Sequence, residues 1–234
     1  MRLMISVVSA TEAREAISGG AEILDIKNPA EGSLGAQFPR IIQEIKQISS
    51  GAVAVSAAIG DMPNLPGTAA LAALGAATCG ADYIKVGLYG PHSEKEAVTL
   101  LQEVRLAVAR YSTAVIAAGY VDFQRAGTLN PDCLPRLAAS AGVNGCLLDT
   151  AIKDGRNLFD FLNPQELRLL ANQAHDFGLL FGLAGALYEK DLPLARDIGA
   201  DVVGLRTAVC RNNQRNGPLE ATRVQRLHRF NFHS

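Results

Sequence analysis

The sequence has no excess of charge of either sign. Its 234 residues include 22 Lys and Arg and 23 Asp and Glu, giving a formal net charge of −1, and no basic run stands out. Binding to nucleic acid or to an anionic membrane surface usually requires a concentration of positive charge. We therefore expect neither a nucleic acid nor a membrane as a partner.

The chain also lacks paired cysteines and long apolar segments. Its four cysteines lie far apart (Cys79, Cys133, Cys146 and Cys210), so we expect reduced, mostly packed thiols. The apolar residues 1–8 form too short a run for a signal-peptide core or a spanning helix. These absences predict a soluble, cytoplasmic protein, long enough to bury a substantial core without disulfides or metal.

What the chain does contain is an alternation of short apolar runs with longer segments of helical periodicity. Eight runs are expected to be strands: 3–8, 22–27, 53–59, 82–86, 114–119, 145–149, 179–183 and 201–206. Pro39 is expected to begin one helix, and residues 163–166 (NPQE) combine a cap, a first-turn proline and an early acid at the start of another. Glycine-led phrases such as Gly80-Ala81-Asp82 introduce several strands, as expected where a helix ends and a strand begins.

Eight such units predict an α/β fold with one domain over residues 1–234, a closed (β/α)8 TIM barrel. The rival architecture is an open, doubly wound sheet. Its G-x-G-x-x-G fingerprint is missing after the first strand, and no linker or low-complexity segment divides the chain. We therefore predict the closed barrel.

Charged side chains at the strand ends indicate a site at the barrel mouth. Asp25 and Lys27 share one face of the second strand, because side chains alternate along a strand. The other even-numbered strands also end in charge, with one more lysine just beyond the sixth: Lys85, Asp149, Lys153 and Arg206. Alternate strands fill the same layer of a barrel, so these side chains are expected to meet. The alternative for Asp25 and Lys27 is a structural or exposed ion pair.

Small residues near the ends of the seventh and eighth strands favour a phosphate site. They let backbone N–H groups approach an anion near a helix N-terminus, and an arginine there can also bind it. The predicted phosphate-binding residues are Gly182, Ala184, Gly185, Gly204, Arg206 and Thr207. Glycine-rich turns also occur for packing alone, but this pattern favours a phosphorylated substrate.

Neither a metal site nor a serine triad is indicated. The four histidines show no ligand spacing, and no candidate serine has an adjacent histidine base. We therefore expect no metal and no cofactor. What remains is lysine chemistry, in which Lys27, Lys85 or Lys153 forms a Schiff base with a sugar-phosphate carbonyl. A free lysine has a pKa of about 10.4, so the nucleophile needs burial or a neighbouring cation to lose its proton.

Motifs along the whole chain resemble the (5-formylfuran-3-yl)methyl phosphate synthase family. They lie at residues 25–29 (DIKNP), 32–35 (GSLG), 85–88 (KVGL), 149–155 (DTAIKDG), 183–185 (LAG) and 206–210 (RTAVC). The resemblance implies a lyase-type synthase that joins two glyceraldehyde 3-phosphate molecules and releases one phosphate. Its product would be 4-(hydroxymethyl)-2-furancarboxaldehyde phosphate, the furan precursor of methanofuran-type cofactors. The resemblance also implies that Lys27 forms the Schiff base, that Lys85 accepts a proton, and that Asp25, Asp149 and Lys153 complete the site.

The sequence leaves two other functions open. One is a phosphosugar decarboxylase or epimerase of the ribulose-phosphate-binding kind, but those decarboxylases use D-x-K-x-x-D, and Ala30 stands at the last position here. The other is a catalytically silent barrel that only binds a phosphorylated metabolite. The sequence does not determine the oligomeric state, and a homo-oligomer is possible.

Overall fold

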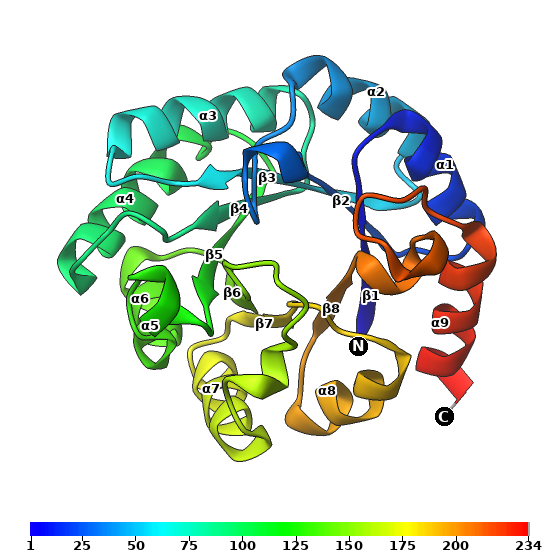
Figure 1. Ribbon diagram of the computed structural model, residues 1–234. Helices are drawn as coiled ribbons and strands as arrows, with labels where there is room; N and C mark the ends of the chain where they lie inside the picture. The colour runs from blue at the N-terminus through cyan, green and yellow to red at the C-terminus, as the bar shows by residue number, and fades with distance from the viewer. Residues whose placement is uncertain (234) are drawn as a thin grey trace.

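A computed structural model describes residues 1–233 and confirms the TIM barrel. Eight parallel strands follow one another around a closed sheet, and β8 pairs with β1 to complete it. The helices form a ring outside the strands (Figure 1). The strands are β1 Arg2–Val7, β2 Ile23–Ile26, β3 Ala54–Asp61, β4 Tyr83–Gly87, β5 Ala114–Tyr120, β6 Gly145–Asp149, β7 Leu180–Leu183 and β8 Val202–Leu205.

Each predicted strand matches an observed one to within two residues at either end. The helices between and after them are α1 Ala10–Ser18, α2 Pro39–Ser49, α3 Pro66–Thr78, α4 Glu94–Ala107, α5 Phe123–Ala126, α6 Leu134–Ala141, α7 Pro164–Asp176, α8 Leu192–Ile198 and α9 Ala221–His233. Helix α2 begins at Pro39, as predicted. At α7, Asn163 accepts from the N–H groups of Gln165 and Glu166, and the Glu166 carboxylate accepts from Asn163 N. Both ends of this capping box are therefore satisfied.

The alternation of side chains along the strands separates two apolar layers. Leu24 and Ile26 of β2 are completely buried in the layer between the barrel and its helices. The opposite set of strand residues fills the lower barrel, where Met4, Ile116 and Leu147 belong to a second cluster. The charged side chains of the site stand above this inner cluster, so they rest on a packed apolar floor.

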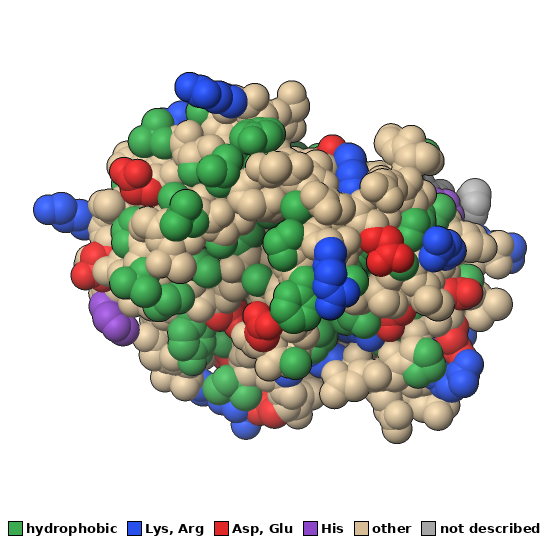
Figure 2. Space-filling model, turned by 90° about the horizontal axis from the view of Figure 1, so that it is seen from above, with side chains coloured by type: hydrophobic (Ala, Val, Ile, Leu, Met, Phe, Trp, Pro, Cys, Tyr) green, Lys and Arg blue, Asp and Glu red, His purple; other side chains and the backbone are tan. Residues whose placement is uncertain are grey.

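The last helix, α9, lies beside α1 and completes the outer ring (Figure 1). The two helices are in close contact, since a Cβ added to Gly19 would lie 2.4 Å from Val224 Cβ. Basic, acidic and hydrophobic side chains are interspersed over the face shown in Figure 2. Over the described residues, the longest apolar helical stretches fall short of what a membrane crossing requires.

Candidate active site

Asp25 lies at the centre of a buried cluster at the end of β2. Its Oδ1 is 2.6 Å from Lys85 Nζ, and its Oδ2 is 3.7 Å from Lys27 Nζ. Ser6, which pairs with Asp25 in the β1–β2 register, donates from Oγ to Oδ2 over 2.9 Å. Burial alone would raise the pKa of Asp25, but Lys85 and Lys27 outweigh it and lower that pKa. Asp25 is therefore held as a carboxylate.

A second buried ion pair stands at the end of β6. Lys153 Nζ lies 2.6 Å from Asp149 Oδ1 and donates to Thr150 Oγ1 over 3.1 Å. Burial would raise the pKa of Asp149, but Lys153 and Lys27 lower it to about 2. Burial lowers the pKa of Lys153 despite the opposing effect of Asp149. This pair supplies a fixed carboxylate and a partly exposed ammonium group.

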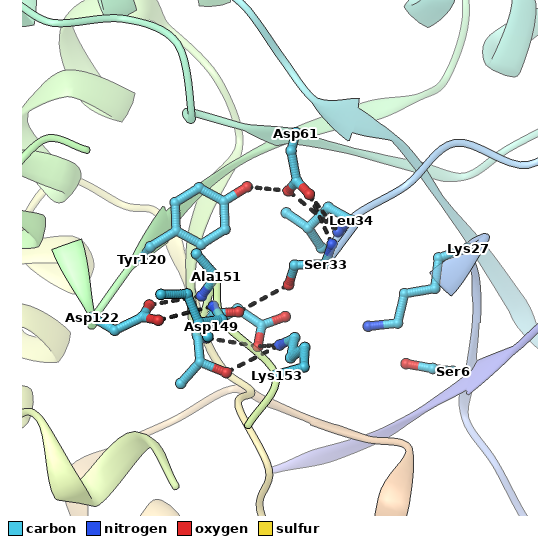
Figure 3. Close-up of polar contacts among 12 residues, drawn as sticks. Ser6, Lys27, Ser33, Leu34, Asp61, Tyr120, Asp122, Asp149, Ala151 and Lys153 are labelled. Atoms are coloured by element: carbon cyan, nitrogen blue, oxygen red, sulfur yellow. Dashed lines mark hydrogen bonds and ion pairs between the residues drawn. The ribbon is translucent and has the colours of Figure 1, made fainter. Parts of the chain in front are cut away.

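Lys27 lies between these two pairs, and its own ion pair with Asp25 is longer, at 3.7 Å. Figure 3 shows the Lys27 side chain reaching into the mouth, opposite Lys153, whose amine is bonded to Asp149. Burial lowers the pKa of Lys27 to about 7, with Asp25 opposing this shift and the positive charge of Lys85 adding to it. Near neutral pH much of Lys27 is therefore a neutral amine, which is the nucleophilic form.

The structure brings all five predicted catalytic residues, Asp25, Lys27, Lys85, Asp149 and Lys153, into the wall of one polar pocket. The pocket has a cavity volume of about 20 Å³. Its floor is formed in part by Met4, which belongs to the inner apolar cluster. Three lysines and two carboxylates thus surround one small space.

Backbone N–H groups line one side of this pocket. Gly185 and Ala186 follow β7 with φ angles of 105° and 52°, and Thr207 begins the short 3-10 helix η5, Thr207–Val209, after β8. Within the part of the chain that the structure describes, the N–H groups of these three residues donate no hydrogen bond. They line the pocket, so they form an arrangement suited to an anion.

Other predicted phosphate ligands differ from expectation. Gly182 lies within β7 and borders a small apolar cavity inside the lower barrel, where a Cβ would come within 3.0 Å of Leu147. The N–H group of Ala184 is used by Leu148 O at 2.8 Å. Gly204 does line the polar pocket. Gly182 therefore provides space for packing, and Ala184 shapes the pocket without offering its N–H group.

Arg206 also differs from its predicted role as a phosphate ligand, because all its guanidinium donors are already bonded within the protein. Both Nη atoms bond the Glu12 carboxylate, Nη1 also donates to Ser6 O, and Nη2 to Gly217 O. Nε donates to Arg215 O over 2.9 Å. All five donors of the arginine fork are thus occupied. Arg206 joins β8 to the start of α1 and to the segment that carries Arg215, instead of presenting free donors to a substrate.

The sequence analysis missed Arg215, which lines the polar pocket. Its Nη2 is buried and, among the described residues, has no hydrogen-bond partner. Burial lowers the pKa of Arg215, whereas Asp149 acts to raise it. Arg215 lies ten residues beyond β8, so a rule that considers strand ends alone does not find it.

Two aspartates that support the mouth were also missed. Asp61, at the end of β3, accepts from Ser33 N at 2.7 Å and from the Tyr120 hydroxyl. Asp122, after β5, accepts from the N–H groups of Ala151 and Ile152. These bonds hold the segments that follow β2 and β6 over the pocket (Figure 3). Both acids lie at odd-numbered strands, and extending the strand-end rule to all eight strands would have found them.

The closed parallel barrel and the lysine and carboxylate cluster at its mouth define a TIM-barrel enzyme. A family model for 4-HFC-P synthase matches residues 3–228. The (5-formylfuran-3-yl)methyl phosphate synthase of Methanopyrus kandleri is 47% identical over 229 residues, covering 97% of each chain. That of Methanosarcina acetivorans is 48% identical over 217 residues, covering 92% of this chain and 93% of the relative. The chain belongs to the 4-HFC-P synthase family.

Solved structures of lower identity share the fold. Phosphoribosyl anthranilate isomerase from Thermus thermophilus aligns with a TM-score of 0.64 at 18% identity and covers 98% of both chains. A 3-hexulose-6-phosphate synthase aligns with a TM-score of 0.66 at 16% identity, covering 97% of this chain and 99% of the other. These likenesses concern the barrel architecture only.

Proposed function

We propose that this protein forms (5-formylfuran-3-yl)methyl phosphate in the cytoplasm from two molecules of glyceraldehyde 3-phosphate, through an imine on Lys27. The observation that carries the proposal is Lys27 itself, a buried lysine whose pKa is lowered to about 7 between two ion pairs. Its position in a chain of the 4-HFC-P synthase family supplies the product. The product would serve a methanofuran-type cofactor.

The first step is attack of the Lys27 amine on the C1 aldehyde of one triose phosphate. Loss of water gives the imine, and the pocket wall holds the charges that accompany this step. An imine at C1 acidifies the hydrogen on C2. The Asp25 and Lys85 pair lies beside Lys27 and would receive this proton, with Lys85 as acceptor.

The electron pair left at C2 can then expel phosphate from C3. The resulting three-carbon enol adds through its C3 to the C2 carbonyl of the second triose phosphate, which has first isomerised from the aldose to the ketose form. The C1 hydroxyl of this second molecule then closes on C2 of the first, and loss of two waters gives the furan. Hydrolysis of the imine restores Lys27 and frees the aldehyde. The balance is two glyceraldehyde 3-phosphate molecules in, and one furan aldehyde phosphate, one phosphate and two waters out. Lys153 and the N–H groups of Gly185, Ala186 and Thr207 would hold the departing phosphate.

The alternatives find less support. In the D-x-K-x-x-D decarboxylase pattern the last residue would be an acid, but Ala30 stands there and is exposed within the short turn η1, Pro29–Glu31. A silent binding barrel would need complementary charge, but it would not need a buried lysine whose pKa is lowered to about 7.

The direct test is incubation of the purified protein with glyceraldehyde 3-phosphate alone. We expect ultraviolet absorbance from a conjugated furan aldehyde, together with release of one phosphate for each furan formed. Substrate that stays unchanged between pH 6 and pH 9 would contradict the proposed function.

A further inference from the structure

A second cavity lies directly outside the polar pocket. The inner pocket, at about 20 Å³, has free space for about one water-sized group. The outer cavity has a volume of about 210 Å³. The two share Lys153, Ala186, Thr207 and Arg215 in their walls. A condensation of two phosphorylated molecules needs space for both at once, and the outer cavity is the adjoining space large enough for the second.

The charged side chains of the outer cavity are all basic. Lys153, Arg156 and Arg215 line it, and no Asp or Glu belongs to its wall as described. Hydroxyl and amide groups supply further polar contacts, from Thr150, Thr207, Tyr188 and Asn213. Basic groups without acidic neighbours in the wall suit a phosphate dianion better than a neutral sugar.

Arg215 has the clearest need of an anionic partner. No ion pair within the described part of the chain includes it, and its buried Nη2 has no hydrogen-bond partner there. A buried guanidinium nitrogen without an acceptor is costly, and a phosphate oxygen would remove that cost. The nearby Arg206 is the contrast, because every one of its donors is used within the protein.

The segment around Arg215 is fixed in place before any ligand binds. Arg206 Nε holds the carbonyl of Arg215, and Arg206 Nη2 donates to Gly217 O. Asn212 and Asn213 adopt positive φ angles of 55° and 53°, which asparagine tolerates in tight turns. The guanidinium of Arg215 thus borders both the inner pocket and the outer cavity.

We propose that the outer cavity binds the phosphate of the second triose phosphate, the one retained in the product, and that Arg215 is its principal cationic ligand. This inference rests on the proposed function, because only a condensation requires two phosphates at once. The phosphate of the Lys27-bound molecule would instead lie where the two cavities meet, on the side of the N–H groups of Gly185 and Ala186.

The test separates binding of the first molecule from binding of the second. Wild type, Arg215→Gln, Arg215→Lys and Arg156→Gln are compared in two assays with glyceraldehyde 3-phosphate. The first assay measures the borohydride-trapped adduct on Lys27 by mass spectrometry, and the second measures the rate of furan formation below saturation. Arg211→Gln is the matched control, since Arg211 lies in the same segment but is exposed and paired with Glu220.

We expect Arg215→Gln to keep adduct formation within twofold of wild type while furan formation falls at least tenfold. Arg215→Lys should recover part of that loss, Arg156→Gln should show a smaller loss, and Arg211→Gln should match wild type. Equal losses of adduct and furan, in an Arg215→Gln variant that unfolds at the wild-type temperature, would overturn the proposal by assigning Arg215 to the first phosphate. Unchanged furan formation in Arg215→Gln and Arg156→Gln would overturn it as well. Absence of both adduct and furan in wild type would instead contradict the proposed function, and this inference with it.

Discussion

Lys27 differs from the other two lysines of the pocket because its carboxylate partner is more distant. Lys85 and Lys153 each lie 2.6 Å from an aspartate oxygen, whereas the distance from Lys27 to Asp25 is 3.7 Å. A lysine bonded closely to a carboxylate must leave that contact to attack a carbonyl, so the buried lysine with the more distant carboxylate is the better placed nucleophile. The three lysines therefore differ in chemistry because their distances to an aspartate differ.

Substitution of this one amine should remove catalysis without removing the fold. Lys27→Arg keeps a positive charge, but a guanidinium stays protonated and cannot form the imine. We expect furan formation to fall by about a thousandfold or more, with little change in the urea unfolding midpoint. Lys46→Arg serves as a control, because Lys46 pairs with Asp82 outside the pocket. An active Lys27→Arg enzyme would transfer the nucleophilic role to Lys85 or Lys153.

The lowered pKa of Lys27 also predicts a pH profile. The free amine exists above the pKa, so kcat/KM should rise about tenfold per pH unit below pH 7 and level off above it. The substrate phosphate titrates near pH 6, and it could produce a limb of its own. Trapping of glyceraldehyde, which has no phosphate, should therefore show the same limb near pH 7. A limb near pH 10 would mean that burial does not activate this lysine.

At the scale of elements, Arg206 links three parts of the barrel mouth. It is 5% exposed and pairs with Glu12, which is 12% exposed and lies in the first turn of α1. Arg206→Ala would leave Glu12 buried without its counterion, at a cost of about 3 to 5 kcal/mol in the free energy of unfolding. Urea denaturation measures this loss.

The double variant Arg206→Ala with Glu12→Gln provides the control for that measurement. Removing both charges should recover part of the loss, since no unpaired carboxylate remains. A single variant as stable as wild type, with only a raised KM, would restore Arg206 to the direct role in phosphate binding that its position at a strand end suggested.

Asp61 plays the corresponding part on the other side of the mouth. It holds the N–H groups of Ser33 and Leu34, while Ser33 Oγ donates to Thr150 O across the barrel. Burial and Asp61 raise the pKa of Tyr120 well above its usual value, so its hydroxyl stays a donor to Asp61. The bonds from Asp61 thus position the segment after β2, which carries Lys27 at its start.

Asp61→Ala should loosen this segment and so affect catalysis without touching the reacting atoms. We expect kcat to fall about 10- to 100-fold, because a small displacement of a positioned group has effects of this size. The limb near pH 7 should move to higher pH, since Lys27 would become less buried and its pKa would rise. Tyr120→Phe removes one of the bonds to Asp61. Its kcat should lie between those of wild type and Asp61→Ala. A kcat and pH limb equal to those of wild type would show that the segment needs no such support.

For the whole molecule, the architecture follows from local patterns and was predictable. Each strand is marked by an apolar run, and capping residues such as Asn163 mark helix starts. Barrel closure then puts residues that are far apart in the chain into one layer, which is why Asp25, Lys85 and Asp149 could be expected to meet. The alternation of side chains along each strand and the order of the strands were sufficient to predict this meeting.

What the sequence did not reveal depends on pairing between distant loops. Arg206 looks the same in the sequence whether its partner is a substrate or Glu12, which stands 194 positions earlier. Arg215 lies in a segment without regular periodicity, and its exposure to the cavity results from the bonds that Arg206 makes to that segment. Such pairings are decided by loop geometry, on which hydrophobic patterning carries no information.

The most direct test of an imine on Lys27 is to locate the adduct in the chain. Wild-type protein is mixed with glyceraldehyde 3-phosphate, reduced with borohydride, digested and mapped by mass spectrometry. We expect a stable adduct on the peptide containing Lys27, absent without substrate and absent from Lys27→Arg. An adduct on Lys85 or Lys153, or furan formation with no adduct on any lysine, would contradict it.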